Sequence, residues 1–309
     1  MVGCMEAHDG VEDGTLQLAD GRRIGYAQYG RPDGEPFFYF HGHPGSRLEA
    51  RFAHQAAAEA GLRVIALDRP GYGLSDFQPG RVITDWPADV AQAAGLLHIG
   101  RFSVAGASGG GPYALACAWR LPDRVVQAAV ISGVGPYQVP GITRGMRWQN
   151  RIGFTWGSRW PALARALMRS MHRSIASRPE RTIEALGRAM SPADAAVVGR
   201  PNVRDVLITD LTEAFRQGIQ GAALDVVLLG RPWGFSLREI HPEVYLWQGE
   251  ADTLVPAAMG KYQAAQIPRS HLTLLPGEGH LLIIDRMPDL AAVLGPTAPP
   301  RLSGSGWRC

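Results

Sequence analysis

The stretch "FSVAGASGGGPYA" (residues 102–114) joins a short apolar run to a serine that is surrounded by glycine and alanine. The apolar run predicts a buried strand, and "YALACAWR" (residues 113–120) predicts a helix. Gly106, Ser108 and Gly110 fit the pattern G-x-S-x-G, which between a strand and a helix puts the serine on a sharp, strained turn. Only small residues fit two positions before and after the serine, because larger side chains would collide across the turn.

A glycine-rich loop between a strand and a helix can also be a simple turn or a phosphate site. The five residues alone leave these alternatives open. No lysine follows the glycines, which excludes a Walker-type phosphate loop, and the spacing G-x-G-x-x-G is absent as well.

A serine hydroxyl becomes a good nucleophile only beside a base, and the base needs an acid to orient it. "YLWQGEADTLVP" (residues 245–256) places Asp252 after a predicted strand, and "LLPGEGHLLII" (residues 274–284) places His280 after the next one. Alone, such an aspartate is usually a helix cap and such a histidine is merely exposed. Arriving in the order Ser108, Asp252, His280, they favour a catalytic triad, with Glu250 and Glu278 as competing acids.

Acyl transfer also needs hydrogen-bond donors for a developing oxyanion. The backbone N–H of Gly109 is one candidate, and the loop "HGHPG" (residues 41–45) supplies the second. Pro44 has no N–H, so we expect the backbone of His43 to donate. His41 and His43 could instead bind a metal, but no third ligand is apparent, and we expect neither a metal nor a cofactor. We expect the His41 ring to brace the loop.

Strands that are apolar on both faces alternate with helices along most of the chain, which predicts a mainly parallel sheet covered on two sides. Asp20-Gly21 predicts an antiparallel hairpin at one edge. Near the end of the chain, "HLLIIDRMPDLAAVL" (residues 280–294) predicts a helix that is interrupted near Pro288. Residues 137–237 break the alternation and predict an inserted helical cap. The predicted core therefore comprises residues 14–136 and 238–295, and we expect disordered tails at residues 1–13 and 296–309.

The cap insertion has an unusual composition. Residues 141–190 contain ten arginines and two acids, with several tryptophans and methionines. The aromatic and methionine side chains would form the cap's own core or line an apolar site. The arginines would form an ordinary solvated face, which we favour, or attract an anionic substrate or membrane surface.

The overall composition bounds the class of protein. The 309 residues are 46% hydrophobic and carry a net charge of +3, which gives no general bias toward nucleic acid. Three scattered cysteines and no evident secretory signal predict a cytoplasmic protein, and no apolar run is long enough for a membrane span. We expect a small-molecule substrate and leave the oligomeric state open.

The motifs "FHGHPGS", "LDRPGYGLSD", "GASGGGP", "GEADTLVP" and "GEGHLL" occur in this order between residues 37 and 284. In this the sequence resembles the α/β-hydrolase superfamily, especially its cap-bearing members. The resemblance implies a mostly parallel eight-stranded sheet flanked by helices, with an inserted helical cap. It implies Ser108 as nucleophile, His280 as base and Asp252 as its orienting acid, with backbone donors at His43 and Gly109. It also implies that the turn at residues 68–75 is scaffold.

The resemblance is less specific for substrate. The "HGHPG" loop is similar to that of epoxide hydrolases and dehalogenases, but those use a carboxylate where Ser108 stands, and the insert has no tyrosine between Tyr137 and Tyr245. Prolyl aminopeptidases typically have tryptophan where Gly109 stands. We therefore expect a serine hydrolase of a carboxylic ester or lactone of a small, largely apolar substrate. The alternatives are a C–C bond hydrolase, an aminopeptidase-like hydrolase, or a non-catalytic ligand-binding protein.

Overall fold

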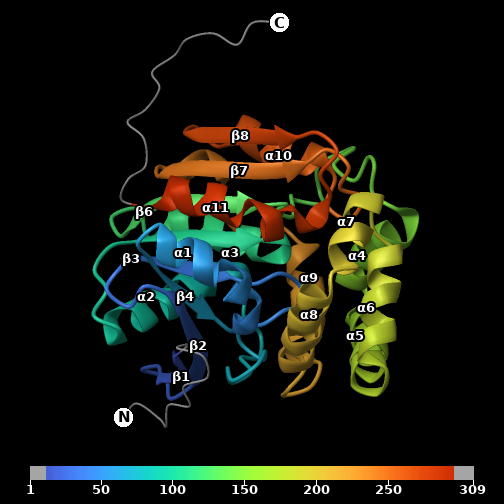
Figure 1. The fold of residues 1–309 in the computed structure, drawn as a ribbon, viewed down its shortest axis with the longest axis horizontal. Helices are drawn as coiled ribbons and strands as arrows, with labels where there is room; N and C mark the ends of the chain where they lie inside the picture. Colours follow the sequence, from blue (N-terminus) through green and yellow to red (C-terminus); the bar gives the residue numbers. More distant parts are fainter. Residues whose placement is uncertain (1–11, 296–309) are drawn as a thin grey trace, which may run out of the picture.

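The computed structural model describes residues 12–295, which form one eight-stranded sheet in the order β1-β2-β4-β3-β5-β6-β7-β8 (Figure 1). β2 runs antiparallel to both β1 and β4, and the remaining neighbours are parallel. The strands are β1 (Glu12–Gln17), β2 (Arg23–Gly30), β3 (Glu35–Phe40), β4 (Leu62–Leu67), β5 (Phe102–Ala107), β6 (Val125–Ile131), β7 (Glu243–Gly249) and β8 (Ser270–Leu275). The predicted fold class, an α/β-hydrolase sheet with an inserted helical cap, is confirmed.

The predicted hairpin joins β1 and β2 through Asp20 and Gly21, and Gly21 has a φ of 85° that suits a residue without a side chain. β1 begins at Glu12, two residues before the predicted start of the core. The predicted tails otherwise lie outside the described residues.

Helices cover both faces of the sheet because both faces are apolar. In β3, Phe38 and Phe40 pack into the core beneath α2, α3 and α10, whereas Phe37 and Tyr39 pack beneath α1 and α11. This alternation is what a strand with two buried faces requires. The core helices are α1 (His54–Glu59), α2 (Trp86–Leu96), α3 (Gly111–Arg120), α10 (Ala257–Gln266) and α11 (Ile283–Leu294), and short 3₁₀ turns are η1 (Arg47–Ala53), η2 (Ile83–Asp85), η3 (Ser108–Gly110), η4 (Leu237–Glu239) and η5 (His280–Leu282).

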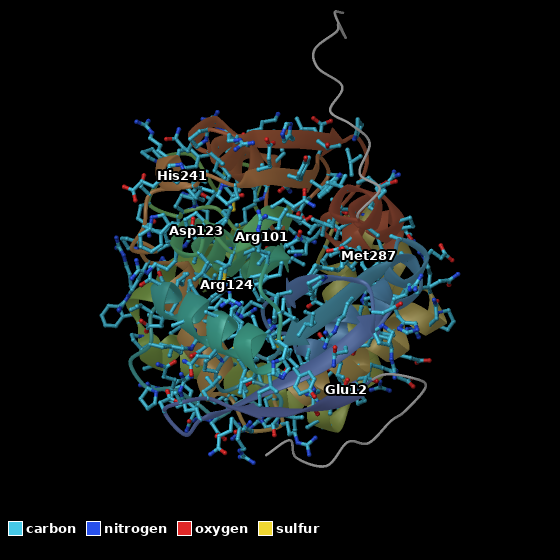
Figure 2. The ribbon with its side chains drawn as sticks, turned by 90° about the vertical axis from the view of Figure 1, so that its left-hand side faces the viewer. Glu12, Arg101, Asp123, Arg124, His241 and Met287 are labelled. Atoms are coloured by element: carbon cyan, nitrogen blue, oxygen red, sulfur yellow. The ribbon has the colours of Figure 1, made fainter. Side chains whose placement is uncertain are left out.

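The cap follows β6 and lies beside the carboxyl ends of the strands, toward which β7 and β8 point in Figure 1. Its helices are α4 (Trp148–Arg159), α5 (Pro161–Ser177), α6 (Pro179–Arg188), α7 (Pro192–Val198), α8 (Pro201–Ala214) and α9 (Gln220–Leu229). Figure 2 shows the side of the molecule away from the cap, on which Arg101 and Asp123 lie. Within residues 12–295, no helix is both long enough and apolar enough to cross a bilayer.

One local expectation was wrong. Pro288 predicts an interruption of the last helix, yet α11 continues through it from Ile283 to Leu294. Proline removes one helical hydrogen bond and crowds the preceding turn. Five buried residues along α11 pack against the sheet and against α1, and this burial outweighs the local cost: Ile283, Met287, Leu290, Ala291 and Leu294.

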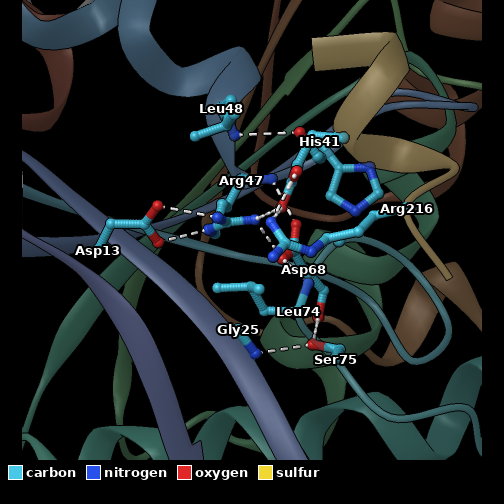
Figure 3. Close-up of polar contacts among 12 residues, drawn as sticks. Asp13, Gly25, His41, Arg47, Leu48, Asp68, Leu74, Ser75 and Arg216 are labelled. Atoms are coloured by element: carbon cyan, nitrogen blue, oxygen red, sulfur yellow. Dashed lines mark hydrogen bonds and ion pairs between the residues drawn. The ribbon is translucent and has the colours of Figure 1, made fainter. Parts of the chain in front are cut away.

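The turn after β4 ties the sheet to the loop that follows β3 (Figure 3). Asp68 accepts hydrogen bonds from the Arg47 backbone N–H at 2.7 Å and from the Leu74 N–H at 2.8 Å. The Ser75 hydroxyl donates to the Asp68 carbonyl at 2.7 Å and accepts from the Gly25 N–H at 2.8 Å. In each of these bonds, the side chain of Asp68 or Ser75 contacts the backbone of another residue. The two side chains therefore hold neighbouring backbone segments together, which is a structural role.

Candidate active site

Ser108 lies directly after β5 in a left-handed backbone conformation, with a φ of 51°. This conformation is costly for a residue with a side chain, and it turns the hydroxyl out of the sheet. A Cβ at Gly106 would lie 2.3 Å from the Gly110 carbonyl oxygen, and one at Gly110 would lie 2.1 Å from the Phe40 carbonyl oxygen. The tight turn therefore requires glycine at both positions.

Asp252 and His280 come together although 28 residues separate them. Asp252 lies after β7 and His280 after β8, and the His280 Nδ1 is 2.8 Å from the Asp252 Oδ2. The other carboxylate oxygen of Asp252 accepts the backbone N–H groups of Leu254 and Val255, both at 2.8 Å. These bonds fix the carboxylate, which in turn fixes the orientation of the imidazole.

Burial and charge act in opposite directions on His280. Burial lowers the pKa of the imidazole, but the Asp252 carboxylate, with smaller effects from Asp194 and Glu49, outweighs it, and the pKa ends above the usual value of 6.5. The aspartate therefore stabilises the protonated ring, which is the form that arises when the imidazole accepts a proton.

The two competing acids do not reach the histidine. Glu250 is exposed at the surface. Glu278 instead accepts a hydrogen bond from Arg286 at 2.7 Å.

Ser108 and His280 line one cavity of about 190 Å³ under the cap. No hydrogen bond joins the Ser108 hydroxyl to His280 within the part of the chain that the structure describes. In serine hydrolases this contact often tightens only when substrate is bound. Most of the remaining wall is apolar, with contributions from Ile131, Leu254, Ile283 and several cap residues.

The two proposed oxyanion donors lie on abutting segments. A Cβ at Gly109 would lie 2.6 Å from the His43 Cβ and 3.3 Å from the His43 backbone nitrogen. Among residues 12–295, the His43 N–H has no hydrogen-bond acceptor. It is therefore free to donate to a ligand beside Ser108.

The two loop histidines have separate roles in the loop. The His41 Nδ1 lies 2.8 Å from the Gly42 carbonyl oxygen, and its Nε2 accepts the Arg69 N–H at 3.2 Å, so the ring braces the loop. The His43 ring lines the cavity and bonds through Nδ1 to the Tyr72 hydroxyl at 2.9 Å. Each ring thus has partners other than a shared metal.

A buried cluster beneath this loop fixes the tautomer of His43. Asp225 on α9 binds the guanidinium groups of Arg69 and Arg81, and despite burial these charges hold the pKa of Asp225 well below its usual range. The Tyr72 hydroxyl donates its single proton to Asp225 at 3.0 Å, so it can only accept from His43. Burial lowers the pKa of His43 to about 4, and the neutral ring therefore carries its proton on Nδ1.

Two carboxyl groups of the cavity wall were missed by sequence reasoning. Glu49 accepts hydrogen bonds from the Gly42 N–H at 2.7 Å and from the Tyr39 hydroxyl at 2.5 Å. Asp210, on cap helix α8, accepts from the backbone N–H and the hydroxyl of Ser46, both at 2.7 Å. Burial raises the pKa of both groups, and the nearby Glu49 raises that of Asp210 further. No motif marks either residue, because only the tertiary placement of the cap brings them together.

Asp194 was missed for the same reason. It belongs to the capping box at the start of α7, and its second oxygen accepts the Leu281 N–H at 2.7 Å. The cap thereby holds the backbone directly after His280.

The cap residues singled out by composition separate into two groups. Met171 lines the cavity and Met168 packs against the buried residues of the cap, so these two serve the predicted roles, whereas Met146 packs into the core of the sheet domain. Trp148, Trp156 and Trp160 serve neither, because they are 67%, 59% and 64% exposed.

Known proteins are similar to this chain in parts of their sequence and in their fold. A non-heme chloroperoxidase from Streptomyces lividans is 36% identical over 133 residues, which are 42% of this chain and 48% of that protein. A proline iminopeptidase from Neisseria gonorrhoeae is 30% identical over 124 residues, 39% of each chain. Both matches therefore span less than half of the relative.

A solved esterase from Exiguobacterium antarcticum superposes with a TM-score of 0.66 at 16% identity, covering 91% of this chain and 97% of the esterase. At this identity the likeness concerns the fold alone. The family model described as the Alpha/beta hydrolase family matches residues 37–293, which include most of β3 and every later strand of the sheet. The chain belongs to the α/β-hydrolase family.

Proposed function

We propose that the protein is a serine hydrolase that cleaves a carboxylic ester or lactone of a small, largely apolar substrate. The observation that carries this proposal is that His280, which is hydrogen-bonded to Asp252, lines the same apolar cavity as Ser108 on its strained turn. A nucleophile, a base and an orienting acid are the parts that acyl transfer needs.

In the first stage, His280 takes the Ser108 proton while the serine oxygen forms a bond to the acyl carbon. The carbonyl π electrons move to oxygen, and the backbone N–H groups of His43 and Gly109 stabilise this oxyanion. The oxyanion then re-forms the carbonyl and expels the alkoxide, which takes the proton from His280. The products are an acyl-serine and an alcohol.

In the second stage, water attacks the acyl-serine while His280 accepts one of its protons. Collapse of the second tetrahedral intermediate returns that proton to the Ser108 oxygen and releases the carboxylic acid. The raised pKa of His280 suits both proton transfers, because the imidazole must hold a proton in each intermediate.

The cavity wall supports an uncharged substrate. The lining is mostly apolar. The pKa values of Glu49 and Asp210 are raised, which means that the protonated, neutral forms of these two wall residues are favoured. A volume of about 190 Å³ favours short acyl and alcohol groups over long chains.

The same pair of carboxyl groups favours a second candidate, an aminopeptidase-like hydrolase. A substrate ammonium group placed between Glu49 and Asp210 would lower the raised pKa values of both carboxyl groups and form an ion pair with the ionised carboxylates. The similarity to a protein named proline iminopeptidase is consistent with this candidate.

A hydrolysis panel tests the proposal: short and long p-nitrophenyl esters, a lactone, a vinylogous diketone and proline p-nitroanilide. We expect the highest kcat/KM on a short neutral ester or the lactone. Ser108→Ala should lower it by at least about a thousandfold. Turnover that survives in Ser108→Ala, or no turnover of any substrate by the folded wild type, contradicts the proposal.

The variant Asp210→Asn separates the two candidates. If the substrate carries an ammonium group, loss of this charge should lower kcat/KM for proline p-nitroanilide by about tenfold or more, and leave a neutral ester nearly unaffected. If the ester is the substrate class, the anilide should be poor in both proteins.

A further inference from the structure

Helix α4 carries a row of large apolar side chains that point into solvent. Trp148, Ile152, Trp156 and Trp160 are 67%, 44%, 59% and 64% exposed. Because they recur every fourth residue, the first three form one stripe along α4, and Trp160 directly follows the end of the helix at Arg159. Single exposed apolar residues are ordinary, but such a stripe, with a third exposed tryptophan directly after it, marks an interaction surface.

The same region carries many arginines and no acidic residue. Eight arginines lie between residues 144 and 178, all are exposed, and no acid occurs between residues 141 and 179: Arg144, Arg147, Arg151, Arg159, Arg165, Arg169, Arg173 and Arg178. Within residues 12–295 none of the eight has a carboxylate partner. Arg151 and Arg159 lie on α4 among the tryptophans.

This charge pattern argues for an anionic occupant. A second copy of the chain would bring the same eight arginines face to face, and like charges repel most strongly where water is excluded. Tryptophan prefers the headgroup level of a bilayer, because its ring is apolar and its N–H is polar. Exposed tryptophans with flanking arginines are typical of helices that lie in the plane of a membrane surface.

We propose that α4 and the first half of α5 bind the surface of an anionic lipid bilayer. The tryptophan rings enter the headgroup region, and the arginines pair with lipid phosphate and carboxylate groups. Helix α4 has 12 residues and lies along the surface rather than across it. α5 also contributes Met171 to the cavity wall, so lipid contact would occur on a helix of the cavity itself.

Vesicle co-sedimentation of the full chain tests this surface. One set of vesicles is pure phosphatidylcholine, and the other contains equal parts of phosphatidylcholine and phosphatidylserine. We expect binding to the anionic vesicles with a blue shift of tryptophan emission. Binding to the neutral vesicles should be weaker by roughly tenfold or more, and high salt should release the protein.

Two double variants and two matched controls locate the surface. Trp148→Ser with Trp156→Ser, and Arg151→Gln with Arg159→Gln, should each weaken binding by roughly tenfold or more. The controls are Leu96→Ser with Val126→Ser, which removes exposed apolar groups from the core domain, and Arg101→Gln with Arg120→Gln, which removes two exposed charges there. Both controls should bind like the wild type, and circular dichroism confirms that all variants fold.

Three results would overturn the proposal. The folded wild type does not bind anionic vesicles, or the cap variants bind as well as the controls. Alternatively, light scattering shows a wild-type dimer that Trp148→Ser with Trp156→Ser converts to a monomer, in which case a second copy covers the stripe. Vesicle binding is measured without substrate, so failure here leaves the proposed hydrolase activity intact.

Discussion

At the residue scale, burial of His280 and the charge of Asp252 have opposite effects on the pKa of the imidazole. The carboxylate holds the pKa of the imidazole above 6.5 although the ring is buried. A base must be neutral to accept the serine proton. In the proposed mechanism, activity is therefore lost as the pH falls through this raised pKa.

The variant Asp252→Asn tests this balance. Without the carboxylate, burial still lowers the pKa of the imidazole and only the weaker effects of Asp194 and Glu49 oppose it, so the acid limb of kcat/KM should move to lower pH. The maximal rate should fall by about 10⁴-fold, because the imidazole loses its orientation as well as its charge partner. A pH profile of p-nitrophenyl ester hydrolysis measures both effects.

Glu250→Gln is the matched control for that experiment. Glu250 lies two residues away and is exposed, so its removal should leave the limb and the rate unchanged. If the acid limb stays in place in Asp252→Asn but moves in Glu250→Gln, the orienting acid is Glu250 and the role proposed for Asp252 is wrong.

At the element scale, the turn between β5 and α3 is so tight that there is no room for a side chain at Gly106 or Gly110. The two glycines that flank Ser108 lie against backbone carbonyls, which cannot move aside as a flexible side chain can. The strain at Ser108 is held in place by this packing.

Gly106→Ala should therefore destabilise the protein by about 1–3 kcal/mol, since the new Cβ would lie 2.3 Å from the Gly110 carbonyl oxygen. Gly95→Ala, in α2, is the control. A Cβ there meets nothing within 4 Å, and alanine in a helix should stabilise by up to about 1 kcal/mol. Urea unfolding of both variants measures these changes, and equal midpoints would contradict this explanation of the turn.

The parts of the fold that the sequence could predict are those governed by local patterns. The strand before Ser108, the Asp20-Gly21 hairpin and the loops that hold Asp252 and His280 follow from apolar runs and turn residues. Pro288 was misjudged because tertiary burial of α11 overrides a local preference. Asp210 and Asp194 were missed because their roles depend on where the cap packs, and Glu49 was missed because its bonds to Tyr39 and Gly42 exist only in the folded loop after β3.

At the scale of the whole molecule, buried carboxylates join the cap to the core, and Asp225 is the one that binds two arginines. Asp225 on α9 accepts hydrogen bonds from Arg69, in the turn after β4, and from Arg81, in the segment before α2. The same cluster holds Tyr72 and, through it, the His43 ring. Cap position and the geometry of the proposed oxyanion site are thus coupled through a few hydrogen bonds.

Asp225→Asn should destabilise the protein by about 3–5 kcal/mol, because two buried guanidinium groups lose their only counter-charge in this cluster. The exposed pair of Arg31 and Asp33 provides the control. Asp33→Asn should leave the unfolding midpoint unchanged, because water solvates that pair in either case. A midpoint for Asp225→Asn equal to that of Asp33→Asn would contradict the coupling.

The most direct measurement of the central claim is intact-mass and peptide mass spectrometry after treatment with a fluorophosphonate. We predict a single adduct on the peptide that contains Ser108, with no adduct in Ser108→Ala and slow labelling in His280→Ala. A folded wild-type protein that takes up no label, or label that persists in Ser108→Ala, would contradict the account.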